Sequence, residues 1–333
     1  MATMAEVAER AGVTKQTVSN VVTGKRVRPE TERRVRAAIE ELGYTPNLVA
    51  RSLATGSTMT VGLFVPTVAN PFYSEVVEEV ENVLERHGYH LLLCTTRNDG
   101  QRARRHLASL SSRNVDALLI AGDKDLIDSL PLLAEAKFPV ALCAWEVEPP
   151  DTLPVVTIDY EHAGYLAGRH LRELGHERVA VVADLPSHAR RVDGFRRAFA
   201  ADGLTVDDAV VFTPPGPSSP GGGFAAATAA LKARPDLTAI FATHDILALG
   251  VLDAVQQAGR EIPGQVSVVG FDDIEQVGRT RPALTTISIP KREMAQQATS
   301  LLLRAITERQ PATNAIQLLR ATLVQRDSSG PAI

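Results

Sequence analysis

The chain has 333 residues, of which 44% are hydrophobic, and a formal net charge of −4 at pH 7. This length exceeds that of one ordinary domain, so a small domain joined to a two-lobed body is expected. The sequence has no run of eighteen apolar residues and no apolar core of a signal peptide, which favours a cytoplasmic location. Cys94 and Cys143 lie in or beside apolar runs and are expected to be buried thiols, and the eight histidines lack metal-ligand spacing. We therefore expect neither a metal nor a cofactor.

The N-terminal segment is predicted to begin with two short helices joined by a tight turn. Thr3 and Glu6 have the spacing of a capping box, so a helix is expected to start directly after Thr3. Gly12 can end this helix in a left-handed conformation, and Thr14 can cap a second helix that runs to about Val22. Two helices joined by a short turn that contains glycine are typical of a helix-turn-helix.

The outward face of the second helix is polar, which suits contact with DNA. The candidate contacts on this face are Thr14, Lys15, Gln16, Thr17, Ser19 and Asn20. Gln16 and Asn20 can pair bidentately with adenine and Lys15 with guanine, whereas the hydroxyl side chains suit phosphates. The alternative is a plain helical hairpin with a polar outer face.

A third helix is expected over residues 29–43, and the charge of this region is positive. Residues 1–57 carry nine Lys and Arg against six Asp and Glu, a net charge of +3, which leaves −7 for the rest of the chain. A basic head on an acidic body indicates that the head alone binds DNA.

The segment from Pro46 to Ala54 is predicted to be a hinge helix. Residues 47–54 make only about two helical turns, which is too short to be stable alone in water, so the segment is expected to order on binding. Leu53 would then be an apolar wedge for the minor groove. The alternative is a linker in which Leu48 and Leu53 pack on the neighbouring domain.

From residue 58 the pattern alternates between apolar strands and helices. The expected strands are Thr60–Val65, Leu91–Cys94, Ala117–Ile120, Val140–Leu142, Val155–Ile158, Val179–Val182, Val210–Phe212, Ala239–Phe241 and Val266–Val269, with a helix over Pro71–His87. Continuous Val, Ile and Leu strands separated by helices indicate parallel sheets covered on both faces, and two such series indicate two lobes.

Ligands of open parallel sheets bind beyond the carboxyl ends of the strands, so the residues that follow each strand are the candidates for a binding site. These candidates are Asn70, Phe72, Tyr73, Asp123, Trp145, Arg190, Arg191, Thr243, His244, Asp245, Phe271, Asp272 and Asp273. Aromatic rings with a few carboxylates and an arginine suit a sugar or a nucleobase. The alternative is that each is a loop residue with a local capping role.

Two motifs at the N-terminus resemble the LacI/GalR (lactose repressor) family of transcription regulators. The head motif A-x-x-A-G-V-[ST]-x-x-T-V-S-x-V stands at Ala8–Val21, and the hinge motif L-G-Y-x-P-N-x-x-A-R-S-L stands at Leu42–Leu53. The resemblance implies a homodimer that binds a pseudo-palindromic operator. It also implies hinge contacts to DNA from Asn47, Ala50 and Leu53, with Leu53 intercalating. Asn20 stands where the family often has arginine, which points to a different half-site.

The body carries further motifs of the same family. Arg191–Phe195 matches R-x-x-G-[FY], and Val269–Asp273 matches V-G-[FY]-D-[DN], so the resemblance makes Arg191 the effector-contacting arginine and Asp272 the ligand carboxylate. His244 stands where asparagine is common, and Pro214–Gly223 lacks the aromatic ring of many relatives. The effector residues are thus expected to be Asn70, Phe72, Tyr73, Asp123, Trp145, Arg191, His244 and Asp272, with Trp145 as the replacement stacking surface.

The sequence as a whole therefore predicts an all-α helix-turn-helix head with a hinge helix, followed by an α/β body like the periplasmic sugar-binding proteins. The expected boundaries are 1–45 for the head, 46–57 for the hinge and 58–333 for the body; the first lobe takes about 58–159 and 288–316, and the second 160–287 and 317–326. The predicted function is a repressor controlled by a sugar or sugar acid bound between the lobes. The alternatives are a purine-responsive repressor, a solute-binding protein without DNA function, and an enzyme.

Overall fold

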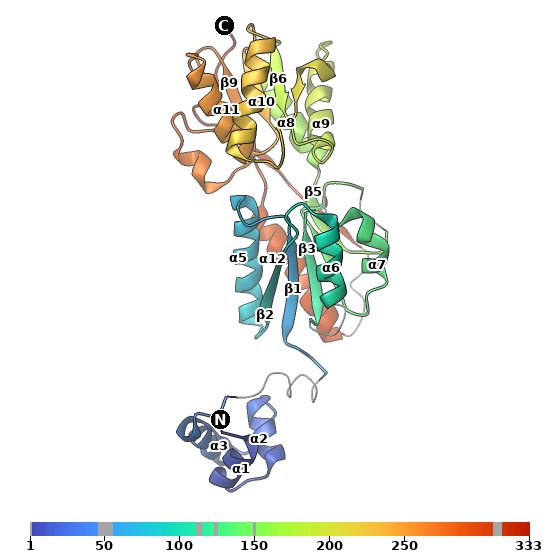
Figure 1. Ribbon diagram of the computed structural model, residues 1–333, viewed down its shortest axis with the longest axis vertical. Coiled ribbons are helices and arrows are strands. Elements are labelled where there is room, and N and C mark those ends of the chain that lie inside the picture. The colour runs from blue at the N-terminus through green and yellow to red at the C-terminus, as the bar shows by residue number, and fades with distance from the viewer. Residues whose placement is uncertain (1, 46–55, 111–114, 123–125, 149–150, 309–314) are drawn as a thin grey trace. The chain divides into compact units, whose positions relative to one another are not determined.

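The computed structural model describes residues 2–45, 56–110, 115–122, 126–148, 151–308 and 315–333. The chain divides into two compact units, residues 1–59 and residues 60–333 (Figure 1). Within the described ranges, no helix combines the length and apolar character that a membrane span requires.

The first unit contains the three predicted helices, α1 (Met4–Ala11), α2 (Lys15–Val22) and α3 (Pro29–Leu42). The capping box is confirmed, because the Glu6 amide donates to the Thr3 hydroxyl and the Thr3 amide donates to the Glu6 carboxylate at 2.7 Å. Val7, Val18 and Val35, one from each helix, are fully buried and form the centre of the small core. This arrangement leaves the polar side of α2 outward.

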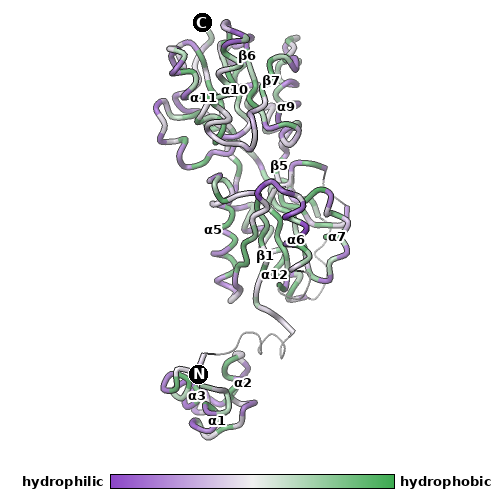
Figure 2. The backbone as a smooth tube through the Cα atoms, viewed as in Figure 1, coloured by the Kyte–Doolittle hydropathy of each residue, from purple (hydrophilic) through white to green (hydrophobic). Residues whose placement is uncertain are grey.

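Six parallel strands form the sheet of the first lobe, in the order β11-β5-β4-β3-β1-β2 among the described residues. They are β1 (Thr60–Val65), β2 (His90–Thr95), β3 (Ala117–Ala121), β4 (Val140–Cys143), β5 (Val155–Ile158) and β11 (Ile316–Leu319). Residues of the central strands are buried on both faces, as their unbroken apolar sequences predict. The hydropathy of these sequences can be followed along the chain in Figure 2.

Helices cover both faces of this sheet (Figure 1). They are α5 (Pro71–Arg86), α6 (Gly100–Leu110), α7 (Leu130–Ala134) and α12 (Lys291–Glu308), with a 3-10 turn at Ile127–Ser129. Val61 and Leu63 of β1 belong to the same core as Val76 of α5, whereas Phe64 belongs to the opposite core with Leu107 of α6. The alternation along β1 therefore assigns successive side chains to opposite layers.

The second lobe repeats this plan with a sheet in the order β12-β10-β9-β8-β6-β7, in which β12 alone is antiparallel among the described pairs. Its strands are β6 (Val179–Val182), β7 (Val211–Phe212), β8 (Ala239–Ala242), β9 (Ser267–Asp272), β10 (Thr285–Ser288) and β12 (Thr322–Val324). Its helices are α8 (Tyr160–Glu173), α9 (Ala189–Ala200), α10 (Pro220–Ala233) and α11 (Asp245–Gln257), with 3-10 turns at Asp208–Val210 and Glu275–Arg279. The turn at Asp208–Val210 delays β7 by one residue relative to the prediction.

The chain passes between the two sheets after β5, after β10 and after β11. The last passage comes later than the expected boundary at residue 316, because Gln317–Leu319 still pairs with β5 as far as Ile158. Likewise, Ser288 pairs with Asp272 and so ends a strand of the second sheet, not a segment of the first lobe. β9 also extends three residues beyond the predicted strand, which makes Asp272 its last residue.

Glycines allow the helices α8 and α9 to lie in direct backbone contact. A Cβ atom at Gly194 would stand 1.8 Å from the Glu161 carbonyl oxygen, and one at Gly164 would stand 2.0 Å from the Arg191 carbonyl oxygen. A side chain at either position would force the two helices apart. The close contact fixes the segment of α9 that carries Arg191.

We expect Gly194→Ala to lower the free energy of unfolding of the full chain by about 2 kcal/mol or more, because the added methyl group has no space. Gly221→Ala is the matched control, since a Cβ at this helical position meets no atom within 4 Å; it should leave stability unchanged or raise it by up to about 1 kcal/mol. Urea unfolding followed by circular dichroism measures both. Equal effects of the two substitutions would contradict this packing argument.

Candidate functional site

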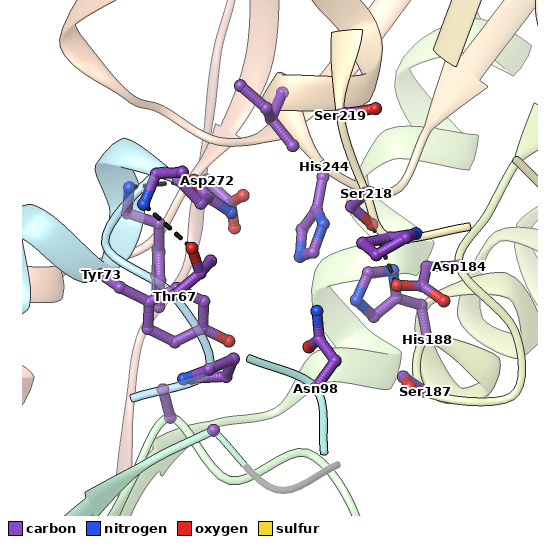
Figure 3. Close-up of a pocket in the computed structure, with 18 of the residues that line it drawn as sticks. Thr67, Tyr73, Asn98, Asp184, Ser187, His188, Ser218, Ser219, His244 and Asp272 are labelled. Atoms are coloured by element: carbon purple, nitrogen blue, oxygen red, sulfur yellow. Dashed lines mark hydrogen bonds between the residues drawn. The ribbon is translucent and has the colours of Figure 1, made fainter. Parts of the chain in front are cut away.

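A cavity of about 270 Å³ lies at the carboxyl ends of the strands and is lined by residues of both lobes. Its lining includes Thr67, Asn70, Phe72, Tyr73, Asn98 and Glu146 from the first lobe, and Tyr160, Asp184, Ser187, His188, Arg191, Ser218, Ser219, His244 and Asp272 from the second. Figure 3 shows Tyr73 and Thr67 on one side of the open space and His244, Ser218 and Asp184 on the other, with Asn98 below His244. This is the position that open parallel sheets offer to a ligand.

Arg191 of α9 is the central charged group of the cavity and is only 5% exposed. Its Nε donates to Glu146 Oε2 at 2.9 Å, its Nη2 lies 2.8 Å from the same oxygen, and its Nη1 donates to the Thr243 carbonyl at 2.6 Å. The guanidinium also lies 4.8 Å from the ring of Tyr160 and 4.2 Å from that of Phe271. Charge, hydrogen bonds and two aromatic faces therefore hold it in one place.

The ion pair compensates for the burial of both charges. Burial alone would lower the pKa of Arg191, but the nearby Glu146 and Asp272 outweigh this effect and hold the pKa above its ordinary value. Because Glu146 follows β4 of the first lobe and Arg191 belongs to the second, the pair also ties the two lobes together.

Asp272 presents a carboxylate that is available to a ligand. The residue is 1% exposed, its Oδ1 is 3.9 Å from Arg191 Nη1, and its Oδ2 has no hydrogen-bond partner among the described residues. Burial raises the pKa of Asp272 well above its ordinary value, although Arg191 and Lys291 act in the opposite direction. A hydroxyl group of a bound molecule could supply the missing partner, since a buried polar atom without one is costly.

Asp245, the first residue of α11, supports the segment that follows Asp272 and does not line the cavity. Its Oδ1 accepts from the Thr286 hydroxyl at 2.6 Å and its Oδ2 accepts from the Ile274 amide at 3.0 Å. Burial raises the pKa of Asp245 to about 7. The carboxyl group of Asp245 therefore positions the segment that follows Asp272.

The side of the cavity formed by α9, α10 and α11 is lined by imidazole and hydroxyl groups. The rings of His188 and His244 lie edge to face with centroids 4.0 Å apart, and His188 Nδ1 is 2.8 Å from the Thr243 hydroxyl. The Ser218 hydroxyl donates to Asp184 at 2.9 Å and joins two loops of the second lobe (Figure 3). Of these groups, Ser218 belongs to Pro214–Gly223, the segment that lacks an aromatic residue.

Six of the eight predicted effector residues line the cavity: Asn70, Phe72, Tyr73, Arg191, His244 and Asp272. Asn70 also caps α5, because its side chain accepts from the Phe72 amide at 3.1 Å. It therefore has the local capping role that was the alternative to a ligand contact. Asp123 lies outside the described residues. Trp145 is 1% exposed, belongs to the core of the first lobe with Phe64 and does not line the cavity. The expectation that Trp145 replaces the missing stacking surface is therefore wrong.

The neighbouring residue, Glu146, is the functional residue that the sequence analysis missed at this strand end. Ala144 has a positive φ of 52°, so the backbone turns sharply after β4 and the alternation of the strand does not continue. Trp145 then enters the core and Glu146 enters the cavity. The signal in the sequence was that Glu146 follows a buried strand. The same signal applies to Asp184 and His188, which follow β6 and also line the cavity.

The recognition face of α2 has the expected polar character. Thr14 caps the helix by accepting from the Thr17 amide at 3.2 Å, and Lys15 is exposed. Gln16 Nε2 donates to Asn20 Oδ1 at 3.1 Å, one helical turn later. This bond leaves the Gln16 carbonyl as an acceptor and the Asn20 amide as a donor. Ser19 is half-buried on the same helix. The hinge candidates Asn47, Ala50 and Leu53 lie outside the described residues.

A helix-turn-helix head on a two-lobed body with a buried polar cavity defines a class of protein, the DNA-binding regulator controlled by a small molecule. Residues 3–47 match the bacterial regulatory proteins of the lacI family, and residues 58–326 match the periplasmic binding proteins and sugar binding domain of the LacI family. The chain is 34% identical to the HTH-type transcriptional repressor PurR of Haemophilus influenzae (strain PittEE), over 93% of this chain and 92% of that protein.

Two solved structures extend the similarity. The lac repressor dimer bound to operator and the anti-inducer ONPF has 27% identity and a TM-score of 0.85, with 99% of each chain covered. The complex of the transcriptional regulator CelR with cellobiose has 31% identity and a TM-score of 0.73, with 98% of this chain and 100% of that chain covered. The chain belongs to the LacI family. It is a DNA-binding repressor regulated by an effector, which excludes the enzyme and the solute-binding protein without DNA function.

We expect Glu146→Ala to lower the free energy of unfolding by about 3–5 kcal/mol, because it leaves the Arg191 guanidinium buried without its main partner. Glu135→Ala removes an exposed glutamate of the first lobe and serves as the control, with an expected effect below about 0.5 kcal/mol. Thermal and urea unfolding of the full chain give both values. A loss below about 1 kcal/mol for Glu146→Ala would show that Arg191 is compensated elsewhere.

Proposed function

We propose that the chain is a homodimeric repressor whose effector is a neutral, polyhydroxylated molecule of the sugar class. One observation carries the proposal: Glu146, Asp184 and Asp272 are carboxylates of the described cavity lining, whereas Arg191 is its single guanidinium. A sugar acid would bring another negative charge into this lining.

The state of Arg191 strengthens this choice. Its Nε, Nη1 and Nη2 already face Glu146 or the Thr243 carbonyl, and its two faces lie against aromatic rings. A ligand carboxylate would therefore have to displace Glu146 to obtain bidentate contact. A sugar hydroxyl needs no such exchange, because it can donate to Asp272 Oδ2 directly.

The purine alternative requires two flat surfaces that bracket a base. Phe72 and Tyr73 are perpendicular, with ring centroids 5.0 Å apart, and Phe72 is largely buried. The segment 217–220 of the lining contains only proline and serine. A sugar suits this lining better, and the similar regulator CelR was solved with cellobiose.

We expect neutral sugars to raise the melting temperature of the full chain and to bind at least about tenfold more tightly than the matching acids, a difference of about 1.4 kcal/mol. The pairs D-glucose with D-glucuronate and cellobiose with cellobionate test this in thermal-shift and calorimetric titrations, with hypoxanthine as the purine probe. Asp272→Asn should weaken binding of the neutral member without loss of folding. Binding of only the acids, or of hypoxanthine alone, would contradict the proposal.

The homodimer is proposed to read a pseudo-palindromic operator, because two-fold symmetric heads require a two-fold site. In the first lobe, β2 is an edge strand that exposes Leu92 and Leu93. This apolar edge suits a second copy better than it suits water. The effector is proposed to change the arrangement of the lobes and thereby the separation of the two hinges, residues 46–54, with Leu53 as the minor-groove wedge.

We expect Asn20→Ala to relax sequence preference at one position of each half-site by about 1–3 kcal/mol, because Asn20 Nδ2 remains free of the bond with Gln16 and can donate to a base edge. Selection from random duplexes followed by fluorescence anisotropy measures the preference. Arg33 of α3 is exposed, and Arg33→Ala serves as the control for a loss of positive charge. Uniform weakening across all sequences by Asn20→Ala would instead assign Asn20 to a phosphate.

A further inference from the structure

Lys291 is a buried lysine that joins the two lobes beside the cavity. It is the first residue of α12, which packs in the first lobe, and it is 6% exposed. Its Nζ donates to the carbonyl oxygens of Asp272 and Asp273 in the second lobe, both at 2.7 Å. The same Nζ lies 3.6 Å from Glu75 Oε2 on α5. The ammonium thus has partners in both lobes.

The two residues that Lys291 holds have an unfavourable backbone conformation. Asp272 has a φ of 117° and Asp273 a φ of 55°, in the region where residues with a side chain are rare. Such conformations are energetically unfavourable and persist only where the surroundings hold them. Two side chains hold this pair: Lys291 donates to both carbonyl oxygens, and Arg326 pairs with the Asp273 carboxylate at 2.6 Å.

These contacts place Asp272 and Asp273 between the cavity and Lys291 of the first lobe. The carboxylate of Asp272 lines the cavity, while its carbonyl oxygen accepts from the ammonium of the first lobe. A displacement of Lys291 therefore removes the two bonds to the carbonyl oxygens of the strained pair, including the bond that holds Asp272 from the first lobe. Arg326 does not provide this link, because it belongs to the segment that returns to the second lobe and bonds the Leu284 carbonyl there.

We propose that Lys291 is a positioning residue that couples the conformation of Asp272 to the arrangement of the two lobes. The inference rests on the proposed function in one respect, the contact of the effector with Asp272. In the arrangement described, Lys291 holds the strained pair and the lobes together. When the lobes rearrange, the Lys291 ammonium leaves the two carbonyl oxygens and the Asp272 carboxylate loses its orientation toward the effector. The competing explanation is that Lys291 only neutralises the charge of Glu75.

The experiment compares distances between and within the lobes in the full chain, without effector or DNA. Spin labels at Ala108→Cys on α6 and Ala229→Cys on α10 report the arrangement of the lobes, and labels at Ala201→Cys and Ala229→Cys report the second lobe alone; all three positions are exposed and the native thiols are buried. Labelled chains are diluted with unlabelled chains, so that each distance lies within one chain. Lys291→Met is compared with Lys232→Met, a matched change at an exposed lysine.

We expect Lys291→Met to shift or broaden the interlobe distance so that at least a tenth of the molecules leave the original distribution, with no change in the intralobe distance. Lys291→Arg should restore the single distribution, because it retains donors at a similar reach. Glu75→Gln should leave the interlobe distance unchanged, since it removes a charge but not the bonds to the carbonyl oxygens.

An unchanged interlobe distance in Lys291→Met would overturn the proposal, as would an equal shift in Lys232→Met. A shift in Glu75→Gln of the same size as in Lys291→Met would favour the charge-neutralising role instead. Loss of folding in both Lys291→Met and Lys291→Gln would also overturn it, because Lys291 would then maintain the fold itself. None of these results depends on the class of the effector, so the proposed function can fail separately.

Discussion

The buried ion pair between Arg191 and Glu146 is the interaction on which the rest of the second unit depends. Neither charge can leave water at acceptable cost without the other, and the two come from different lobes. The arrangement of the lobes and the charge of the cavity are therefore set by the same contact. The Arg191 guanidinium that lines this cavity is already paired with Glu146, whereas Asp272 Oδ2 has no hydrogen-bond partner among the described residues.

The motif that contains Arg191 has a physical reason for its spacing. Arg191 and Gly194 are one helical turn apart on α9; the arginine points into the cavity and the glycine lets α8 approach the backbone. Gly164 of α8 accommodates the Arg191 carbonyl from the other helix. The guanidinium of Arg191 is thus held by its hydrogen-bond partners, and its backbone is held by the close contact of α8 and α9.

The sequence was sufficient to predict the helical head, the two parallel sheets and most of the cavity. Unbroken apolar runs identify buried strands, and the strand-end rule then selects Tyr73, Arg191, His244 and Asp272. The strand-end rule failed at Trp145 because the positive φ of Ala144 reverses which of two adjacent side chains lines the cavity. A local conformation of this kind leaves no periodic signal in the sequence.

Contacts between distant segments were beyond prediction for a different reason. The partners of Lys291 are backbone carbonyl oxygens nineteen and eighteen residues away, which any residue type provides. The boundary between the lobes after β11 likewise depends on the pairing of β11 with β5, more than 150 residues earlier, and not on composition. Helices and strands can be predicted from residue types that repeat along the chain, whereas these contacts exist only once the lobes are assembled.

The magnitudes of the interlobe contacts decide how an effector can act. Coupling between two sites in a regulator is typically about 1–3 kcal/mol. Loss of one partner of a buried ion pair costs about 3–5 kcal/mol when the other charge stays buried, as it would if Glu146 moved away while Arg191 kept its buried position. An effector whose affinities for the two arrangements differ by only this coupling energy therefore cannot drive a rearrangement that leaves Arg191 buried without Glu146. It has to act through weaker contacts, and the strained pair Asp272 and Asp273, held by Lys291, lies in the required range. The lobes are then expected to rearrange about an intact Arg191–Glu146 contact, with the change concentrated on the side of the cavity where Lys291 lies.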